Sequence, residues 1–294
     1  MKLLKEKFQK RVKSNFINLI NEKELINDFH YKKTINLWGQ NVNKKNKSKH
    51  IAEDTHIEKV LIEYPIEDNI DNYLEIGCGE GIDVNYLQNN YKIKNTYVLD
   101  IGENIYELSK LHKFQGIFFC RCDCLNLPFK KNSFDFIYSY GVFHHTPNLK
   151  LAIEEAKKVL KKSGTLIFYN YIKHKNFIKR FGVFIETILL KLLQNRSYEN
   201  VKFFCYLISP IILLIFSYPA QLLKLLGSKK IYKKFPLWWG LKPNDIILDL
   251  LDRLYAPINI RLSKLEMIKL LHDINFSYVE VREVSDGLFC KVVK

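Results

Sequence analysis

The sequence predicts an α/β fold with a mostly parallel sheet, on three observations. Residues 73–81 read Y-L-E-I-G-C-G-E-G, an apolar strand that runs into three closely spaced glycines. A second predicted strand, 96–99, ends at Asp100, about 20 positions after that loop. Two further strands are predicted at 278–283 and 288–293, separated by an S-D-G hairpin turn.

The glycine loop is the most informative of these features. Glycines at 77, 79 and 81 let the backbone turn sharply and come close to a ligand. A helix is predicted from Ile82, so the loop lies between a strand and a helix N-terminus, where nucleotide-like ligands bind. A dinucleotide fingerprint would place its third glycine at position 82, which is Ile here. The loop therefore predicts a nucleotide-like cofactor other than a nicotinamide dinucleotide.

The elements after the loop follow in the order that an open α/β sheet requires. Strands are predicted at 117–120, 133–139 and 165–169. A helix is predicted at 152–160, with lysines near its C-terminus that suit the helix dipole. A second helix is predicted at 263–272, with a serine cap.

Several motifs together resemble the type 11 family of class I S-adenosylmethionine (SAM) dependent methyltransferases. They are the glycine loop, Asp100, Asp123, the L-P-F of 127–129 and the Y-G-V-F-H-H-T-P of 140–147. The resemblance covers roughly 71–170 and, more loosely, 245–294. It implies a Rossmann-like, mostly parallel seven-stranded sheet with a C-terminal antiparallel strand, and SAM as the cofactor. Where the family usually has Pro-Gly-Gly this chain has K-S-G, a departure that affects a turn.

The resemblance also implies a cofactor site at the ends of the strands. Its residues would be Glu75, Gly77, Cys78, Gly79, Gly81, Asp100, Ile101, Asp123, Cys124, Tyr140 and Gly141. Asp100 would accept hydrogen bonds from the ribose hydroxyls, and Asp123 would contact the adenine amino group. Tyr140 and Gly141 would flank the methionine end, and Glu75 would order the glycine loop.

The expected acceptor side combines two histidines with a later segment. His144 and His145 follow the fourth strand, at the edge where ligands bind in such sheets. Histidine is a suitable base at neutral pH, so both are candidate catalytic residues; the alternative is a structural role. Asp252 and Tyr255 belong to a D-x-x-x-x-P segment similar to one found before the last helix of related enzymes. They are expected to face the acceptor, the alternative being a simple loop-to-helix connection.

The charge of the chain leaves two classes of partner open. The 294 residues carry a net charge of +15, and the sequence pI is about 9.3. The excess is mostly lysine, whereas arginine is the residue suited to bidentate phosphate recognition, so nucleic acid is disfavoured. An anionic membrane surface suits the charge equally well.

The six cysteines predict neither a metal site nor a disulfide framework. Three of them alternate at 120, 122 and 124, which is not the spacing of zinc ligands. Alternate residues of a strand share one face, so packing beside the cofactor is expected. Charges interrupt residues 1–13, and no secretory leader is recognised there. The expected location is the cytoplasm, with peripheral contact to the inner face of the membrane as an addition.

The pattern divides the chain into four regions. Residues 1–70 are expected to form an N-terminal helical extension, 71–170 the SAM-binding core, 171–245 an apolar helical insertion and 246–294 the return to the core. A polar basic loop is expected at 43–49.

The first region begins with apolar residues at helical spacing. These are Leu4, Phe8, Val12, Phe16 and Leu19. They predict a helix with one apolar face. It either lies on a membrane surface or packs on the core near the cofactor cleft.

The insertion is unusually apolar, since no charged residue occurs from Phe203 to Leu223. That length could span a bilayer, but a single span would separate the terminal strands from their sheet. Three interpretations remain: a lid over the active site, a hairpin dipping into one leaflet, or a dimer interface. Tyr232, Trp238 and Trp239, among lysines, suit either an interfacial belt or a pocket wall.

Together these features predict a SAM-dependent methyltransferase with a small apolar or amphiphilic acceptor, such as a lipid, a quinone precursor or a lipid-linked glycan. One alternative is a membrane-associated SAM-binding protein without turnover. The other is an RNA methyltransferase, which S-Y-G at 139–141 disfavours because base-amine methylation uses motifs such as N-P-P-Y. The oligomeric state is left open.

Overall fold

The structure is a computed structural model. It describes residues 2–20, 31–35, 37, 56–111, 114–228, 231–232, 235, 237, 240–284 and 287–294. Some sequence predictions lie outside these residues. They are the basic loop at 43–49, the first two residues of the 285–287 turn, and the roles of Trp238, Trp239 and the lysines at 230, 233 and 234.

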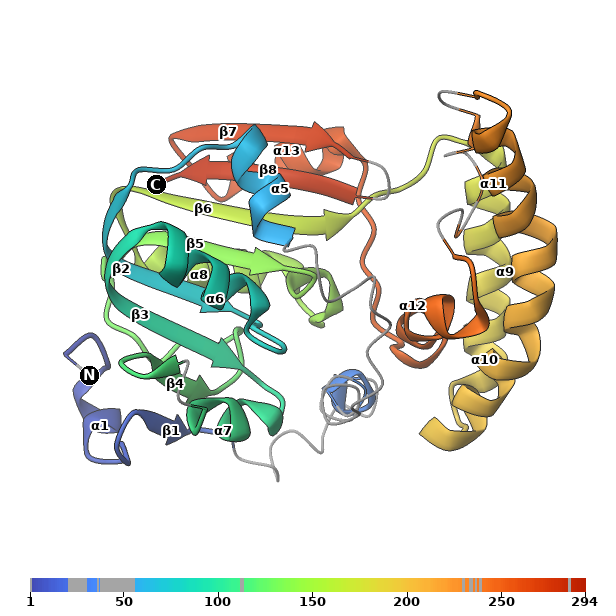
Figure 1. Cartoon of the computed structure of the whole chain (residues 1–294). Coiled ribbons are helices and arrows are strands. Elements are labelled where there is room, and N and C mark those ends of the chain that lie inside the picture. Colours follow the sequence, from blue (N-terminus) through green and yellow to red (C-terminus); the bar gives the residue numbers. More distant parts are fainter. Residues whose placement is uncertain are drawn as a thin grey trace.

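One eight-stranded sheet organises the described chain (Figure 1). Its strands are β1 (Phe16–Asn18), β2 (Asn69–Ile76), β3 (Lys92–Asp100), β4 (Phe118–Arg121), β5 (Phe134–Tyr140), β6 (Leu160–Tyr171), β7 (Tyr278–Glu283) and β8 (Gly287–Val293). Their order is β1-β4-β3-β2-β5-β6-β8-β7. Every neighbouring pair is parallel except the two pairs that include β8. The predicted α/β class and the antiparallel C-terminal strand are confirmed.

Helices cover both faces of this sheet. They are α1 (Glu6–Gln9), α5 (His56–Glu63), α6 (Ile82–Asn90), α7 (Asn104–Ser109), α8 (Leu149–Val159) and α13 (Lys264–Asp273). One core lies between the sheet and the helices α8 and α13, and another lies under α5 and α6. The predicted serine cap is confirmed, because Ser263 and Glu266 form a reciprocal capping box at the start of α13.

The predicted N-terminal helix is wrong. A single turn, α1, is followed by β1, which pairs in parallel with β4 and places Ile17 opposite Cys120. The reason is that β4 would otherwise present an unpaired edge. Here the Phe119 N–H donates to the Asn15 carbonyl at 2.7 Å, and the Leu19 N–H donates to the Arg121 carbonyl at 2.8 Å. The apolar spacing thus reflects core contacts made by a loop and an eighth strand, beyond the seven expected.

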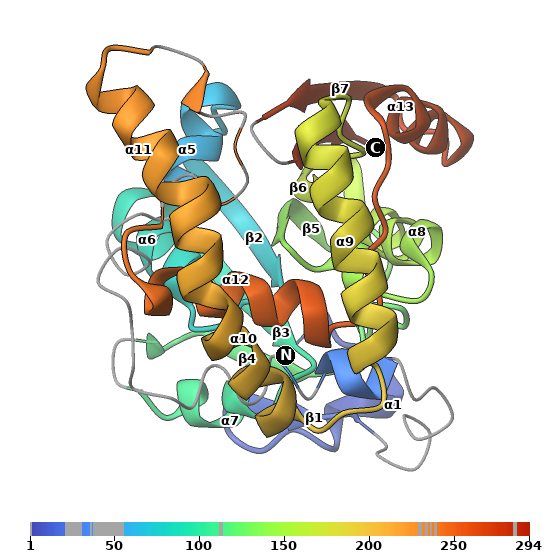
Figure 2. The same cartoon turned by 90° about the vertical axis from the view of Figure 1, so that its right-hand side faces the viewer.

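A second group of helices forms an outer layer on one side of the sheet domain (Figures 1 and 2). It contains α9 (Phe177–Leu193), α10 (Tyr198–Ile212), the π-helical segment η3 (Leu213–Ser217) and α11 (Tyr218–Leu225). The helix α12 (Pro243–Tyr255) lies between this layer and the sheet. Buried residues of α10 and α12 share one apolar core, so the expected domain boundary at 245 falls inside a helix of that group.

The run from Tyr198 to Leu225 is one helix of 28 residues, long and apolar enough to cross a membrane on these two criteria alone. The strands on either side of it are joined, however, because β6 pairs with β8 from Thr165 to Tyr171. A span would require this pairing to cross the bilayer.

Candidate functional site

The glycine loop connects β2 to α6 and is fixed against two neighbouring strands. Gly77, Gly79 and Gly81 have φ values of +78°, +52° and +71°, in the left-handed region that favours glycine. The Gly77 N–H donates to the Leu99 carbonyl of β3 at 2.7 Å. On the other side, a Cβ at Gly77 would collide with the Val142 side chain after β5.

Two of the predicted cofactor glycines border open space. A Cβ at Gly79 or at Gly141 would meet no heavy atom within 4 Å. These residues follow β2 and β5, which are parallel neighbours, so both lie at the same edge of the sheet. Ligands of open α/β sheets bind at this carboxyl edge. The glycines therefore fit a ligand, such as SAM, that must approach the backbone closely.

Asp100 ends β3 with its carboxylate bonded to the loop. It accepts from the Gly79 N–H at 3.0 Å and from the Gly102 N–H at 2.8 Å. Burial raises the pKa of Asp100, and these two N–H groups act against that rise. Asn104 Nδ2 donates to the Gly79 carbonyl at 2.9 Å, adding a second tie. Asp100 thus orders the glycine loop, a role additional to the predicted ribose contact.

Asp123 has a hydrogen-bond partner, Tyr31, that the sequence did not predict. Its Oδ1 accepts from the Leu125 N–H at 2.8 Å and from the Tyr31 hydroxyl at 2.8 Å. Burial raises the pKa of Asp123, and both hydrogen bonds oppose that rise. Burial likewise raises the pKa of Tyr31, so the phenol keeps its proton and donates. The interpretation of the first region as packing near the cofactor cleft was the only sequence signal for Tyr31.

Glu75 lies buried at the end of β2 and accepts from the Tyr73 hydroxyl at 2.6 Å. Burial, and next the neighbouring Asp83, raise the pKa of Glu75. The structure thus shows Glu75 in a buried pair, and its effect on the glycine loop stays a prediction.

Three further predicted cofactor residues lie at the same sheet edge. Cys78 is buried in the loop, and Cys124 is buried just after β4. Ile101 follows β3, and its carbonyl accepts from Arg121 Nε at 3.2 Å. These residues shape the edge through packing and backbone position.

Tyr140 is the middle ring of a stack at the end of β5. The His56 ring lies 4.1 Å from it on one side and the Tyr169 ring 4.5 Å on the other, both nearly parallel to it. His56 begins α5, so this stack joins a helix on one face of the sheet to the strands β5 and β6. It gives the predicted methionine end of the site a rigid aromatic wall.

His145 and Asp252, predicted separately, are brought together. His145 Nε2 lies 3.5 Å from Asp252 Oδ1, and both side chains are buried. His145 Nδ1 lies 2.9 Å from the Ile258 carbonyl, which can only accept, so Nδ1 carries a proton. The other carboxylate oxygen, Oδ2, accepts from the Tyr171 hydroxyl at 2.6 Å. Nε2 is thus the nitrogen that could exchange a proton, and it faces a carboxylate.

His144 is placed differently from its neighbour. Its side chain is fully buried, and both ring nitrogens lack a hydrogen-bond partner among the described residues. Burial, and next the adjacent His145, lower the pKa of His144 well below its ordinary value. A neutral ring packed at 4.1 Å from the Tyr171 ring fits the structural role better than the catalytic one.

Asp252 and Tyr255 lie on the last turns of α12 rather than on a loop. Lys33, from the N-terminal region, places its ammonium 4.3 Å above the Tyr255 ring and donates to the Gln194 carbonyl after α9 at 2.7 Å. Burial lowers the pKa of Lys33. The segment that carries Tyr31 and Lys33 therefore links the cofactor edge to the outer helices.

An ion-pair network also ties α9 to this region. Glu186 of α9 accepts from Arg261 at 2.7 Å and from Arg253 at 3.4 Å. The Arg261 guanidinium lies 4.9 Å from the centre of the Tyr171 ring. Tyr171 donates to Asp252, so a chain of side-chain contacts links α9 of the outer layer to the predicted acceptor side.

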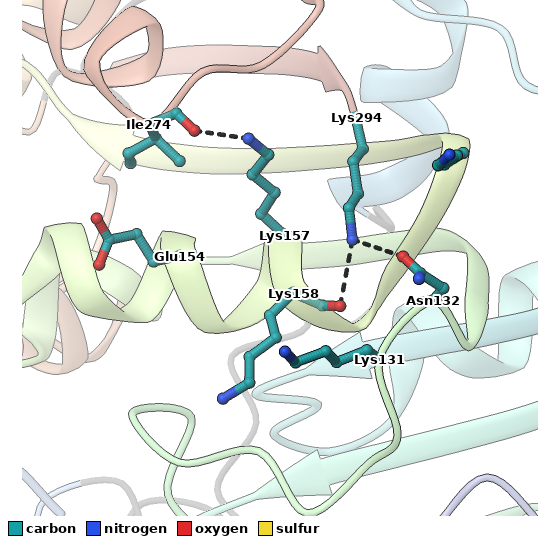
Figure 3. Close-up of a pocket in the computed structure, with 8 residues that line it drawn as sticks. Lys131, Asn132, Glu154, Lys157, Lys158, Ile274 and Lys294 are labelled. Carbon is teal, nitrogen blue, oxygen red and sulfur yellow. Dashed lines mark hydrogen bonds between the residues drawn. The ribbon is translucent and has the colours of Figure 1, made fainter.

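A basic hollow elsewhere on the surface is separate from this site (Figure 3). Its lining includes Lys157, Lys158, Lys294 and Asn132. Lys157 Nζ donates to the Ile274 carbonyl at 2.6 Å, and Lys294 Nζ donates to Asn132 at 2.8 Å. These residues lie near the starts of β5 and β6, at the sheet edge opposite the glycine loop.

The family comparison matches the core of the chain. Residues 74–168 match the model of the Methyltransf_11 family, described as a methyltransferase domain. This segment contains the glycine loop, Asp100, Asp123 and both histidines.

Curated relatives match less than half of the chain. The chain is 33% identical over 116 residues to an uncharacterised protein of Methanocaldococcus jannaschii, covering 40% of this chain and 48% of that protein. It is 30% identical over 125 residues to phthiotriol/phenolphthiotriol dimycocerosates methyltransferase 1 of Mycobacterium ulcerans, covering 42% and 46%. It is 34% identical over 112 residues to probable tRNA methyltransferase 9B of Homo sapiens, covering 36% and 23%. The chain thus spans less than half the length of these relatives.

Solved structures share the fold. A Thermotoga maritima SAM-dependent methyltransferase, titled a possible histamine N-methyltransferase, aligns with a TM-score of 0.50 at 15% identity, covering 88% of this chain and 99% of that one. A DhpI–SAH complex aligns with a TM-score of 0.53 at 11% identity, covering 89% and 95%. With the glycine cradle and the sheet order, the family match identifies residues 74–168 as a class I SAM-dependent methyltransferase domain of the Methyltransf_11 family.

Proposed function

We propose that this chain transfers the methyl group of SAM to an amphiphilic acceptor with a long apolar part. The observation that carries the cofactor half is the cradle of Gly77, Gly79 and Gly81, held by Asp100 at the carboxyl edge of the sheet. Bound SAM would supply a methyl group already activated by its sulfonium. The chain would bind and align the two reactants and exclude water, which suffices for an in-line displacement.

The acceptor half of the proposal is supported by what adjoins the site. The helix α12 carries Asp252 and Tyr255 and packs against the apolar helices α9 and α10. An acceptor that reached His145 along α12 would therefore pass a largely apolar surface. A relative named as a phthiotriol/phenolphthiotriol dimycocerosates methyltransferase agrees with an acceptor of this class.

For an oxygen acceptor, the pair of His145 and Asp252 would take up the proton. Nδ1 of His145 is held by the Ile258 carbonyl, so the ring has one orientation. Nε2 and Asp252 Oδ1 lie 3.5 Å apart in a buried position, so the released proton would pass to this pair. His144, neutral and enclosed, would support the ring of its neighbour.

The test is transfer of labelled methyl from SAM by the purified full chain. Three acceptor pools from the source cells are offered separately: a lipid extract, small water-soluble compounds and total RNA. We expect label in the lipid pool. A Gly77→Ala variant, checked by circular dichroism, should give none because its Cβ meets Val142.

Label in RNA would replace the lipid proposal with the activity named for the human relative. SAM binding without label in any pool would instead favour a binding protein without turnover.

A further inference from the structure

The outer helical layer presents a long apolar face to its surroundings. Along α10, η3 and α11, the side chains of Phe203, Leu207, Leu214 and Leu222 are 65%, 58%, 68% and 58% exposed. They recur on the side of the run that is turned away from α12. This face continues for about 30 Å, at 1.5 Å per helical residue, without a charged side chain.

The helix α9 adds further exposed apolar side chains on this side of the molecule. Phe181, Phe184 and Leu192 are 55%, 59% and 69% exposed, at spacings that place them on one side of that helix. Figure 2 looks directly at α9 and at the α10–α11 run, which lie outermost on this side of the molecule. We name the exposed apolar side chains of these helices the outer face.

The opposite side of α10 and of the start of η3 is buried. Val201 and Cys205 of α10 are fully buried, and Leu213 is 2% exposed; all three belong to the core that includes α12. The inward apolar side chains of α10 and η3 are therefore already packed in this core. Soluble monomers rarely leave so long an apolar stretch exposed, so the outer face is expected to meet another apolar phase.

The charge of the residues near the outer face favours an anionic lipid surface as the apolar phase that it meets. Residues 171–245 contain thirteen Lys and Arg and only three Asp and Glu. Two of the acids are committed within the chain: Glu186 binds Arg253 and Arg261, and Asp245 caps α12. Lys202 and Lys224 stand at the two ends of the uncharged stretch. An apolar face flanked by lysines, within a basic stretch of the chain, complements an anionic lipid surface.

Two other arrangements fit these observations less well. A symmetric pair of copies would bring two strongly basic regions face to face, at a cost in like-charge repulsion. A full span by the α10–α11 run would place the two halves of one sheet on opposite sides of the bilayer, because β6 pairs with β8.

We propose that the outer face docks the protein on an anionic lipid bilayer, with α9 and the α10–α11 run lying in the interface and the sheet domain in water. Docking itself does not depend on methyl transfer. Its use in catalysis rests on the proposed function: α12 packs against α10 and carries Asp252, which contacts His145, so docking would hold the predicted acceptor side close to the lipid surface.

The experiment is flotation of the full chain with vesicles of phosphatidylcholine alone or of equimolar phosphatidylcholine and phosphatidylglycerol. We expect binding to the anionic vesicles and weaker binding to the neutral ones. A Leu207→Glu/Leu214→Glu variant should bind the anionic vesicles at least about tenfold more weakly, since burying one leucine alone is worth that factor.

The matched control is Ile62→Glu/Leu265→Glu. Its positions are 77% and 78% exposed but lie on α5 and α13, away from the outer face, so vesicle binding should be unchanged. Circular dichroism and SAM titration of both variants separate a docking failure from loss of the fold or of the cofactor site.

Three results would overturn the proposal. One is equal loss of binding in the two variants. Another is a dimer in light scattering, dissociated by Leu207→Glu/Leu214→Glu, with no vesicle binding by the wild type. The third is retention of bound protein in the membrane after alkaline carbonate extraction, which would indicate a span.

Discussion

At the scale of single residues, the two adjacent histidines have opposite environments. His145 meets Asp252 at 3.5 Å and the Ile258 carbonyl at 2.9 Å, so each ring nitrogen faces an oxygen. His144 is enclosed, and its pKa is lowered well below the ordinary value by burial and by His145. One histidine thus lies between two oxygens, and the other is held neutral.

His144 should make the protein less stable in acid. The unfolded chain binds a proton at the ordinary pKa of about 6.5, whereas folded His144 binds one only at lower pH, so stability rises with pH through this window. Between about pH 7.5 and about pH 5.5, this one group should cost the wild type about 1.4 kcal/mol of unfolding free energy.

Urea unfolding of wild type and His144→Gln at both pH values measures that difference. The variant should lose less stability on acidification by this amount. His272→Gln, at an exposed histidine near the end of α13, should behave as the wild type does. An unchanged pH dependence in His144→Gln would contradict a neutral buried ring.

The sequence predicts these residues but not their pairing. His145 and Asp252 belong to two separate motifs. Their contact depends on how α12 docks beside β5 and β6, which is a tertiary event that neither motif contains. Tyr31 was missed for the same reason: its hydroxyl meets Asp123 at 2.8 Å only because the first region folds back over the sheet edge.

At the scale of elements, local sequence patterns predicted helices and strands correctly where one face of the element is buried in the core. The strand at 278–283 and the start of α6 at Ile82 were found as predicted, and β8 begins at Gly287, one residue earlier than expected. The N-terminal segment failed because apolar residues at helical spacing can also be supplied by a loop and a short strand. This segment forms a strand because it pairs with the edge of β4, and a local sequence pattern contains no information about that pairing.

Ile17→Ala should show that β1 belongs to the core. Ile17 is 1% exposed and sits opposite Cys120, so truncation should lower the unfolding free energy by about 2–4 kcal/mol. Ile62→Ala, on an exposed position of α5, should change it by less than about 0.5 kcal/mol. Chemical denaturation of both variants is the measurement. Equal, small effects would mean that the segment before α5 is not packed on the sheet.

At the scale of the whole molecule, a methyltransferase domain carries an outer helical layer. The inward apolar side chains of α10 and η3 are packed against α12, whereas those of the outer face are exposed. The sequence predicted the apolar insertion and left a lid, a leaflet-dipping hairpin and a dimer interface open. It could not choose, because the choice depends on which side of α10 is turned toward α12. That orientation supports the proposed lipid surface as the partner of the outer face.

The proposed function requires the whole molecule to bind SAM through the glycine loop. The most direct test is calorimetric titration of the full chain with SAM and, separately, with NAD. We predict binding of SAM and none of NAD. Asp100→Ala should weaken SAM binding by about 1–3 kcal/mol, because it removes a buried charged acceptor that also holds Gly79. Asp71→Ala, on an exposed position of β2, should leave SAM binding unchanged. Absence of SAM binding by the folded wild type, or equal affinity in Asp100→Ala, would contradict a SAM site built on the glycine loop and Asp100.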